Sequence, residues 1–172
     1  ERLIRAGKQA NIIHANLNIP HFYGTEPKLQ LDNQQIELLK SIPADIGFIA
    51  CNTAHVFFEQ IQTLVSCRLE HLIKNANPPK NGVVLCSPTS KQIKIFGNLE
   101  YLSNNKNELI LKLIQDVNDE AEISSTVLKE ITKDISKPLI FGCTEISLQA
   151  HKEGLSGTDT LKITIDKIIN EI

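Results

Sequence analysis

The chain reads IGFIACNTAH at residues 46–55 and PLIFGCTEI at residues 138–146. Each stretch is a short apolar run that ends at a cysteine, Cys51 or Cys143, and a threonine follows that cysteine within two residues. Short apolar runs bounded by turn residues are typical of buried strands in parallel sheets. Because a hydroxyl residue at such a position commonly opens a helix, both stretches predict a strand, a turn that carries the cysteine, and a helix.

The rest of the chain alternates between strand-like and helix-like patterns. Further strands are predicted over residues 11–19, 67–69 and 82–86, and helices over residues 33–42, 54–65, 107–117, 125–135 and 158–172. The last of these helices is amphipathic, with its apolar side chains expected on one buried face. The segment 74–82 is rich in Asn, Pro and Gly and is typical of a linker. Together these patterns indicate an α/β fold of parallel sheets flanked by helices, with a domain boundary near residue 76.

Composition excludes several classes of protein. The chain has 172 residues, 22% of them charged, and a formal net charge of -2, so no basic excess suggests nucleic acid or an anionic membrane as a partner. No apolar run approaches the length of about 20 residues that spans a bilayer. The four cysteines show no CxxC spacing and no accompanying histidine cluster, so we expect neither a metal site nor a disulfide framework. A reducing, cytoplasmic location fits best.

The paired cysteines suggest proton transfer at carbon. A thiol at a helix N-terminus meets unpaired backbone N–H groups, which favour the thiolate and make the cysteine a usable base. The same amides, with the side chains of Asn52, Thr53 and Thr144, are suited to bind a carboxylate. If two such thiols flank the Cα of a substrate, one abstracts a proton and the other returns one on the opposite face.

Each of these residues also has a plainer interpretation. A single cysteine after an apolar strand is more often a small buried side chain than a catalyst, and we keep that interpretation for Cys67 and Cys86. His55 either orients a carboxylate or caps its turn. Glu145 either exchanges protons with a cysteine or complements a helix dipole. The segment 87–90 either adds hydroxyls to the site or is an ordinary turn.

The sequence resembles a known superfamily. The stretches 51–55, CNTAH, and 142–146, GCTEI, look like the two signature motifs of the aspartate/glutamate racemases, and Glu145 is similar to the aspartate racemase branch. The resemblance implies two pseudo-symmetric α/β domains, residues 1–76 with 155–172 and residues 77–154, with the active site in the cleft between them. It further implies a homodimer that racemises an amino acid without a cofactor.

The same resemblance assigns roles within the site. Cys51 and Cys143 would be the two catalytic bases. The α-carboxylate of a small-molecule amino acid or dicarboxylate would be held by a set of polar residues, namely Asn52, Thr53 and Thr144, with Thr89 and Ser90 nearby. His55 and Glu145 would be candidate assisting residues.

The sequence departs from the family in two places. The glycine-rich opening strand of the family does not appear in the chain, so we expect a preceding segment to complete the first domain. Aspartate racemase-like enzymes carry an arginine shortly after the Ile-Pro that corresponds to Ile19-Pro20, where His21 and Phe22 stand here. The substrate is therefore left open between aspartate and another amino acid. Alternatives are a decarboxylase or isomerase of a dicarboxylic acid, a non-catalytic ligand-binding relative, or a redox pair of the two cysteines.

Overall fold

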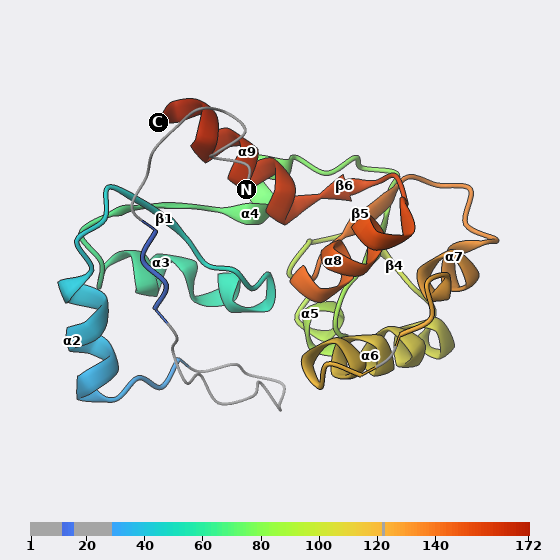
Figure 1. The fold of residues 1–172 in the computed structure, drawn as a ribbon, viewed down its shortest axis with the longest axis horizontal. Helices are drawn as coiled ribbons and strands as arrows, with labels where there is room; N and C mark the ends of the chain where they lie inside the picture. The colour runs from blue at the N-terminus through green and yellow to red at the C-terminus, as the bar shows by residue number, and fades with distance from the viewer. Residues whose placement is uncertain (1–11, 16–28, 122) are drawn as a thin grey trace.

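The computed structural model describes residues 12–15, 29–121 and 123–172, and within them the chain is an α/β protein with two parallel sheets (Figure 1). The smaller sheet pairs β1, Ile46–Phe48, with β2, Arg68–Glu70. The larger sheet has the strand order β4-β3-β5-β6. Its strands are β3 at Val83–Leu85, β4 at Glu100–Tyr101, β5 at Leu139–Phe141 and β6 at Thr158–Asp159. Every pairing is parallel, which confirms the predicted fold class.

The helices of the described residues surround these sheets. They are α2 at Asn33–Ser41, a 3₁₀ helix at Thr53–Phe57, α3 at Phe58–Gln62, α4 at Leu72–Ala76, α5 at Pro88–Gln92, α6 at Asn104–Asn118, α7 at Val127–Thr132, α8 at Thr144–Glu153 and α9 at Thr160–Glu171. The helix α2 begins as predicted, with Asp32 at its N-cap position. Asp32 accepts a hydrogen bond from the Gln35 N–H, and the Gln35 side chain accepts one from the Asp32 N–H. No helix in the described part of the chain has the length and apolar character needed to cross a membrane.

Both faces of the larger sheet are buried. Side chains alternate along each strand, so Leu85 and Phe141 join the core that α6, α7 and α8 contribute to, whereas Val84 and Ile140 point the other way and pack against Phe96. Leu85 and Ile140 are completely buried, and burial of such a side chain stabilises a fold by about 1.5–3 kcal/mol. This packing fixes the carboxyl ends of β3 and β5, which carry the segments 86–90 and 142–146.

The first part of the chain differs from the sequence prediction. The strand β1 is only half-buried, whereas β3 is buried throughout. Residues 12–15 form no regular element, and Ile12 is 79% exposed, so the strand predicted over 11–19 is wrong there. The remainder of that predicted strand, with His21 and Phe22, lies outside the described residues.

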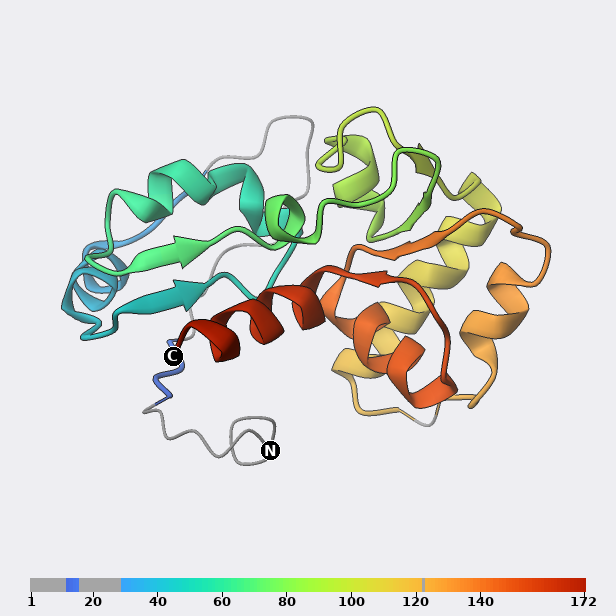
Figure 2. The same ribbon diagram turned by 90° about the horizontal axis from the view of Figure 1, so that it is seen from above.

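The helix α9 packs differently from the amphipathic pattern. Its fully buried side chains are Thr160 and Thr164, its apolar side chains are half-buried, and Ile172, which follows the helix, is 50% exposed. Figure 2 shows α9 extending from β6 to lie beside the smaller sheet, and it packs against α4. The helix was predicted correctly, but polar contacts rather than isoleucines define its buried face.

Candidate active site

The first cysteine turn follows β1. Cys51 lies three residues beyond the strand and is exposed, and the 3₁₀ helix begins at Thr53. Protein atoms nevertheless surround the sulfur on its other sides, and this burial raises the pKa of the Cys51 thiol. Backbone N–H groups of Ala54 and Thr53 act in the opposite direction, as does the Thr53 side chain, but the negative charge of Glu145 adds to the increase.

The second cysteine turn follows β5. Cys143 caps the N-terminus of α8, and its Sγ donates a hydrogen bond to Glu145 Oε2 at 2.8 Å. The Thr144 hydroxyl donates to the same oxygen at 2.9 Å. Burial, the charge of Glu145 and this hydrogen bond raise the pKa of the Cys143 thiol well above its ordinary value, and a charge on Cys51 raises it further.

These contacts bring the two sequence motifs together. Glu145 acts on the pKa of both thiols, and Cys51 acts on the pKa of Cys143, although the two cysteines are 92 positions apart in the chain. The two cysteine turns therefore lie within range of each other's electric charge. Because both sulfurs share one carboxylate neighbour, ionising both thiols at once would place three negative charges together, which is unfavourable.

The helix N-termini are not the largest influence on the pKa of either thiol. The N–H groups at the two helix starts do lower the thiol pKa values, as expected, but burial of each sulfur and the charge of Glu145 outweigh them. The pKa of each thiol is therefore raised above its ordinary value. The sequence places Glu145 in the first turn of α8 but does not say that its carboxylate turns back toward the sulfurs.

A glycine allows the second turn to lie close to the core. A Cβ on Gly142 would come within 2.7 Å of the Phe96 ring and 3.1 Å of Val84 Cγ1. Real Cβ atoms do not approach neighbouring carbons so closely, so a side chain at this position would displace either the Phe96 ring or the strand end. Gly142 thereby fixes where Cys143 stands.

His55 secures the first turn rather than facing outward. The ring is 4% exposed, its Nε2 lies 3.1 Å from the Leu72 N–H, and its Nδ1 lies 2.8 Å from the Cys51 carbonyl. Since Nε2 accepts from a backbone N–H, Nδ1 carries the proton and donates it to the carbonyl. Burial lowers the pKa of His55 to about 4. Of its two interpretations, capping the turn is the one that these contacts support.

A cluster of hydroxyls joins the first turn to the segment after β3. Thr53 Oγ1 lies 2.6 Å from Ser90 Oγ and 3.3 Å from Ser87 Oγ. Ser90 is completely buried, and Thr89 is half-buried beside it. The segment 87–90 is not an open turn: Ser87 caps α5, and its Oγ accepts a hydrogen bond from the Ser90 N–H.

Asn52 makes a contact that sequence reasoning missed. Its side chain is 2% exposed, and Nδ2 donates to Thr160 Oγ1 at 3.1 Å. The motif predicted a carboxylate-binding role for this amide, but the structure pairs it with the first residue of α9. Asp159 before it is a recognisable N-cap residue, so the helix start had a signal, whereas the contact with Asn52 had none.

The other two cysteines are core residues. Cys67 and Cys86 are buried, 5% and 1% exposed, and burial raises the pKa of Cys86 to about 12, in agreement with their interpretation as small apolar side chains. A groove between α6 and α7, lined by residues such as Leu109 and Val127, also lies away from the cysteines. Across the described ranges, no group of three or more His, Cys, Asp or Glu side chains is arranged to hold a metal ion.

Comparison with solved structures identifies the architecture. An aspartate racemase from Picrophilus torridus superposes with a TM-score of 0.60 at 19% identity, over 81% of this chain and 67% of that one. The chain has the fold of the aspartate/glutamate racemases. An aspartate racemase homologue from Pyrococcus horikoshii matches with a TM-score of 0.54 at 16% identity, over 80% of this chain and 71% of that one.

A glutamate racemase from Campylobacter jejuni matches with a TM-score of 0.53 at 13% identity, over 81% of this chain and 65% of that one. The chain thus spans about two thirds of the length of these racemase structures. Neither a protein-family model nor a curated protein sequence matches it. At these identities the racemase structures establish the fold, and the fold agrees with the resemblance of the two cysteine motifs.

Proposed function

We propose that the protein is a cofactor-independent amino-acid racemase in which Cys51 and Cys143 exchange protons with the substrate Cα. The observation that carries this proposal is the convergence of two strand-end thiols on one carboxylate, Glu145, in a chain with a racemase fold. General acid-base catalysis at carbon needs a base on one face and an acid on the other, and a matched pair of thiols supplies both.

The charges that raise the thiol pKa values also divide the roles of base and acid between the two cysteines. Once one thiol has lost its proton to solvent, its charge adds to that of Glu145 and disfavours ionisation of the second, so one cysteine acts as base and the other remains an acid. In one turnover the thiolate takes the Cα proton while the opposite thiol donates its own, which inverts the carbon. The protonation states of the two sulfurs are thereby exchanged, and the reverse reaction starts from that state.

The substrate's α-ammonium group would assist this step. A positive charge near Glu145 offsets its negative charge and so removes part of what raises the two thiol pKa values. The α-carboxylate would be held by hydroxyls and backbone amides of the two turns, with Thr53 and Thr144 the donors next to the sulfurs. Thr89 and Ser90 stand behind Thr53, and Asn52 acts by holding its turn.

The proposal extends to the arrangement of the chain. We assign residues 1–76 with 155–172 to a first domain and 77–154 to a second, with the site in a cleft between them. Contact between α9 and α4 supports the grouping of the last segment with the first. A cytoplasmic homodimer follows from the same resemblance, and sedimentation analysis of the purified protein tests the subunit number. The side chain of the substrate stays open between aspartate and another amino acid.

Hydrogen exchange at Cα tests the proposal directly. The protein is incubated in D₂O with both enantiomers of each of a panel of amino acids, and deuterium at Cα is measured by mass spectrometry. We expect incorporation into at least one amino acid, and loss of two-way racemisation in Cys51→Ser and in Cys143→Ser. Cys67→Ser is the matched control and should retain activity, because Cys67 precedes β2 at the end of the smaller sheet opposite to Cys51.

Two results would overturn this function. The first is the absence of exchange across the whole panel with the unsubstituted protein. The second is full two-way activity in either serine variant, because the proposed mechanism needs a thiol on each face of Cα. A decarboxylase or isomerase that uses the same intermediate needs only one proton donor.

A further inference from the structure

A buried hydroxyl connects the two cysteine turns. Thr160, the first residue of α9, is 0% exposed, and its Oγ1 accepts from Asn52 Nδ2 at 3.1 Å. The same oxygen lies 3.2 Å from the Phe141 carbonyl and 3.3 Å from Asn52 Oδ1, and either accepts its proton. Asn52 is the neighbour of Cys51, and Phe141 stands two residues before Cys143. We propose that Thr160 is a positioning residue that sets the geometry between the two cysteines.

The position of Thr160 is fixed from the sheet side. The residues before it form β6, in which Thr158 pairs with Ile140 and Asp159 with Phe141. Asp159 Oδ1 accepts from the Lys162 N–H at 2.8 Å and from the Ser147 hydroxyl at 3.0 Å. The start of α9 is therefore tied both to β5 and to α8, the helix that carries the second motif.

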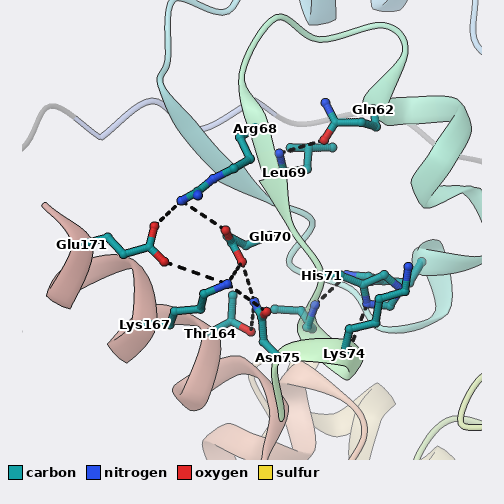
Figure 3. Close-up of polar contacts among 12 residues, drawn as sticks. Gln62, Arg68, Leu69, Glu70, His71, Lys74, Asn75, Thr164, Lys167 and Glu171 are labelled. Atoms are coloured by element: carbon teal, nitrogen blue, oxygen red, sulfur yellow. Dashed lines mark hydrogen bonds and ion pairs between the residues drawn. The ribbon is translucent and has the colours of Figure 1, made fainter. Parts of the chain in front are cut away.

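The rest of α9 is held by contacts with β2 and α4. Thr164, Lys167 and Glu171 follow Thr160 along one face of the helix and contact the first half of the chain, as Figure 3 shows. Lys167 Nζ lies 2.6 Å from Glu70 Oε2 and 3.2 Å from Asn75 Oδ1.

The Glu70 carboxylate is the centre of this network. Its side chain is 7% exposed and also accepts from Asn75 Nδ2 at 2.8 Å, while Arg68 pairs with Glu70 at 3.2 Å. Burial alone would raise the pKa of Glu70, but the bonds from Lys167 and Asn75 and the two cationic charges lower it. Charge-assisted bonds of this kind hold α9 against α4 and β2.

The polar face of α9 consists of Thr160, Thr164, Lys167 and Glu171. Thr160 is the end of this face that contacts the cysteine turns. Its hydrogen bonds are buried, and breaking a buried bond leaves the remaining partner without water to replace it. If Thr160 lost its hydroxyl, the Asn52 amide would have to move to find another partner, and the Cys51 turn would move with it. Burial and the charge of Glu145 both raise the pKa of the Cys51 thiol in its present position, so a displacement of the turn that weakens either one lowers that pKa.

This inference rests on the proposed function for its effect on turnover, but its effect on Cys51 is separate. Thr160→Val removes the hydroxyl at nearly constant volume, and Thr160→Ser keeps it. Thr164→Val is the matched control: it makes the same change at another fully buried threonine of α9, whose hydroxyl contacts Asn75 instead of the site.

The first measurement is the pH dependence of alkylation of Cys51 by iodoacetamide, with the Cys51 peptide quantified by mass spectrometry. We expect the apparent pKa of Cys51 to fall in Thr160→Val, toward that of an ordinary thiol, and the rate at pH 8 to rise about threefold to tenfold. Thr160→Ser and Thr164→Val should follow the unsubstituted protein. The second measurement is Cα exchange, for which kcat of Thr160→Val should fall about tenfold with KM changed less than threefold.

The outcomes separate the inference from the proposed function. If no variant exchanges any amino acid but the Cys51 titration moves in Thr160→Val alone, the racemase function fails and the positioning role stands. If the titration of Thr160→Val coincides with that of the unsubstituted protein, or if Thr164→Val moves it equally, the positioning role is overturned. Should Thr160→Val fail to fold by circular dichroism, Asn52→Leu removes the same bond from its other end, and an unshifted titration there overturns the role equally.

Discussion

Acidification should destabilise the protein through His55. This ring is buried and neutral, with one nitrogen donating to the Cys51 carbonyl and the other accepting from the Leu72 N–H. Protonation would put a second N–H against the Leu72 N–H and a charge next to His71, whose ring centroid lies 4.6 Å away. The folded protein therefore resists protonation of His55, and its pKa falls to about 4.

The sign and size of the effect follow from linkage. An unfolded histidine has a pKa of about 6.5, so between about pH 6.5 and 4 the unfolded chain binds a proton that the folded protein does not. The contribution of neutral His55 is fully present above pH 6.5 and is lost as the pH falls toward 4. For these two pKa values the free energy of unfolding should drop by about 1.4 kcal/mol at pH 5.5 and by about 2.5 kcal/mol at pH 4.5.

Denaturant unfolding followed by circular dichroism between pH 7.5 and 4.5 measures this drop. Other groups also titrate in that range, so the quantity to compare is the change with pH in the unsubstituted protein and in His55→Gln. The substituted protein should lose about 2.5 kcal/mol less over the range, whatever its stability at pH 7.5. His151→Gln, at an exposed position on α8, controls for removing a histidine. Equal pH dependence in the unsubstituted protein and His55→Gln would refute the reasoning.

Two further predictions concern packing and charge. Gly142→Ala should lower the free energy of unfolding by about 1–3 kcal/mol in thermal melts, because its Cβ would meet the Phe96 ring, and Phe96→Leu in the same chain should restore part of the loss. An unchanged melt would contradict the close approach. Lys167→Met should cost about 1–2 kcal/mol, less than for a fully buried pair because Lys167 is 42% exposed. Lys162→Met, which breaks the exposed pair with Asp166 on the same helix, should cost at most about 0.5 kcal/mol, and equal losses in the two variants would argue against a special role for Glu70.

The parts of the fold that the sequence predicts are those that depend on short stretches of residues. The apolar runs before Cys51 and Cys143 and the capping residues of α2 each act over a few positions, so the parallel strands and the helix starts follow from short stretches. The strands β4 and β6 were not predicted, because each has only two residues and depends on a neighbour in the sheet. The pattern also located both cysteines on strand-to-helix turns, where the structure places them.

Long-range contacts set the details that the sequence did not reveal. Asn52 and Thr160 are 108 positions apart, and neither residue type indicates the other as its partner. The pKa values of the two thiols are a similar case, since a helix N-terminus is visible in the sequence but burial and the direction of Glu145 are not. In α9 the isoleucine period suggested an apolar buried face, whereas bonds from Thr164 and Lys167 to the first half of the chain decided the packing.

The polar contact between Glu70 and α9 also has a consequence during protein synthesis. Lys167 is translated 97 residues after Glu70, which at ribosomal speeds of about 5–20 residues per second is a delay of about 5–20 seconds. Throughout that interval the Glu70 carboxylate lacks its lysine, and β2 cannot bury it at low cost. The strands β1 and β2 are therefore made before the helix that supplies this lysine, so the smaller sheet should reach its native packing only after the larger sheet has emerged.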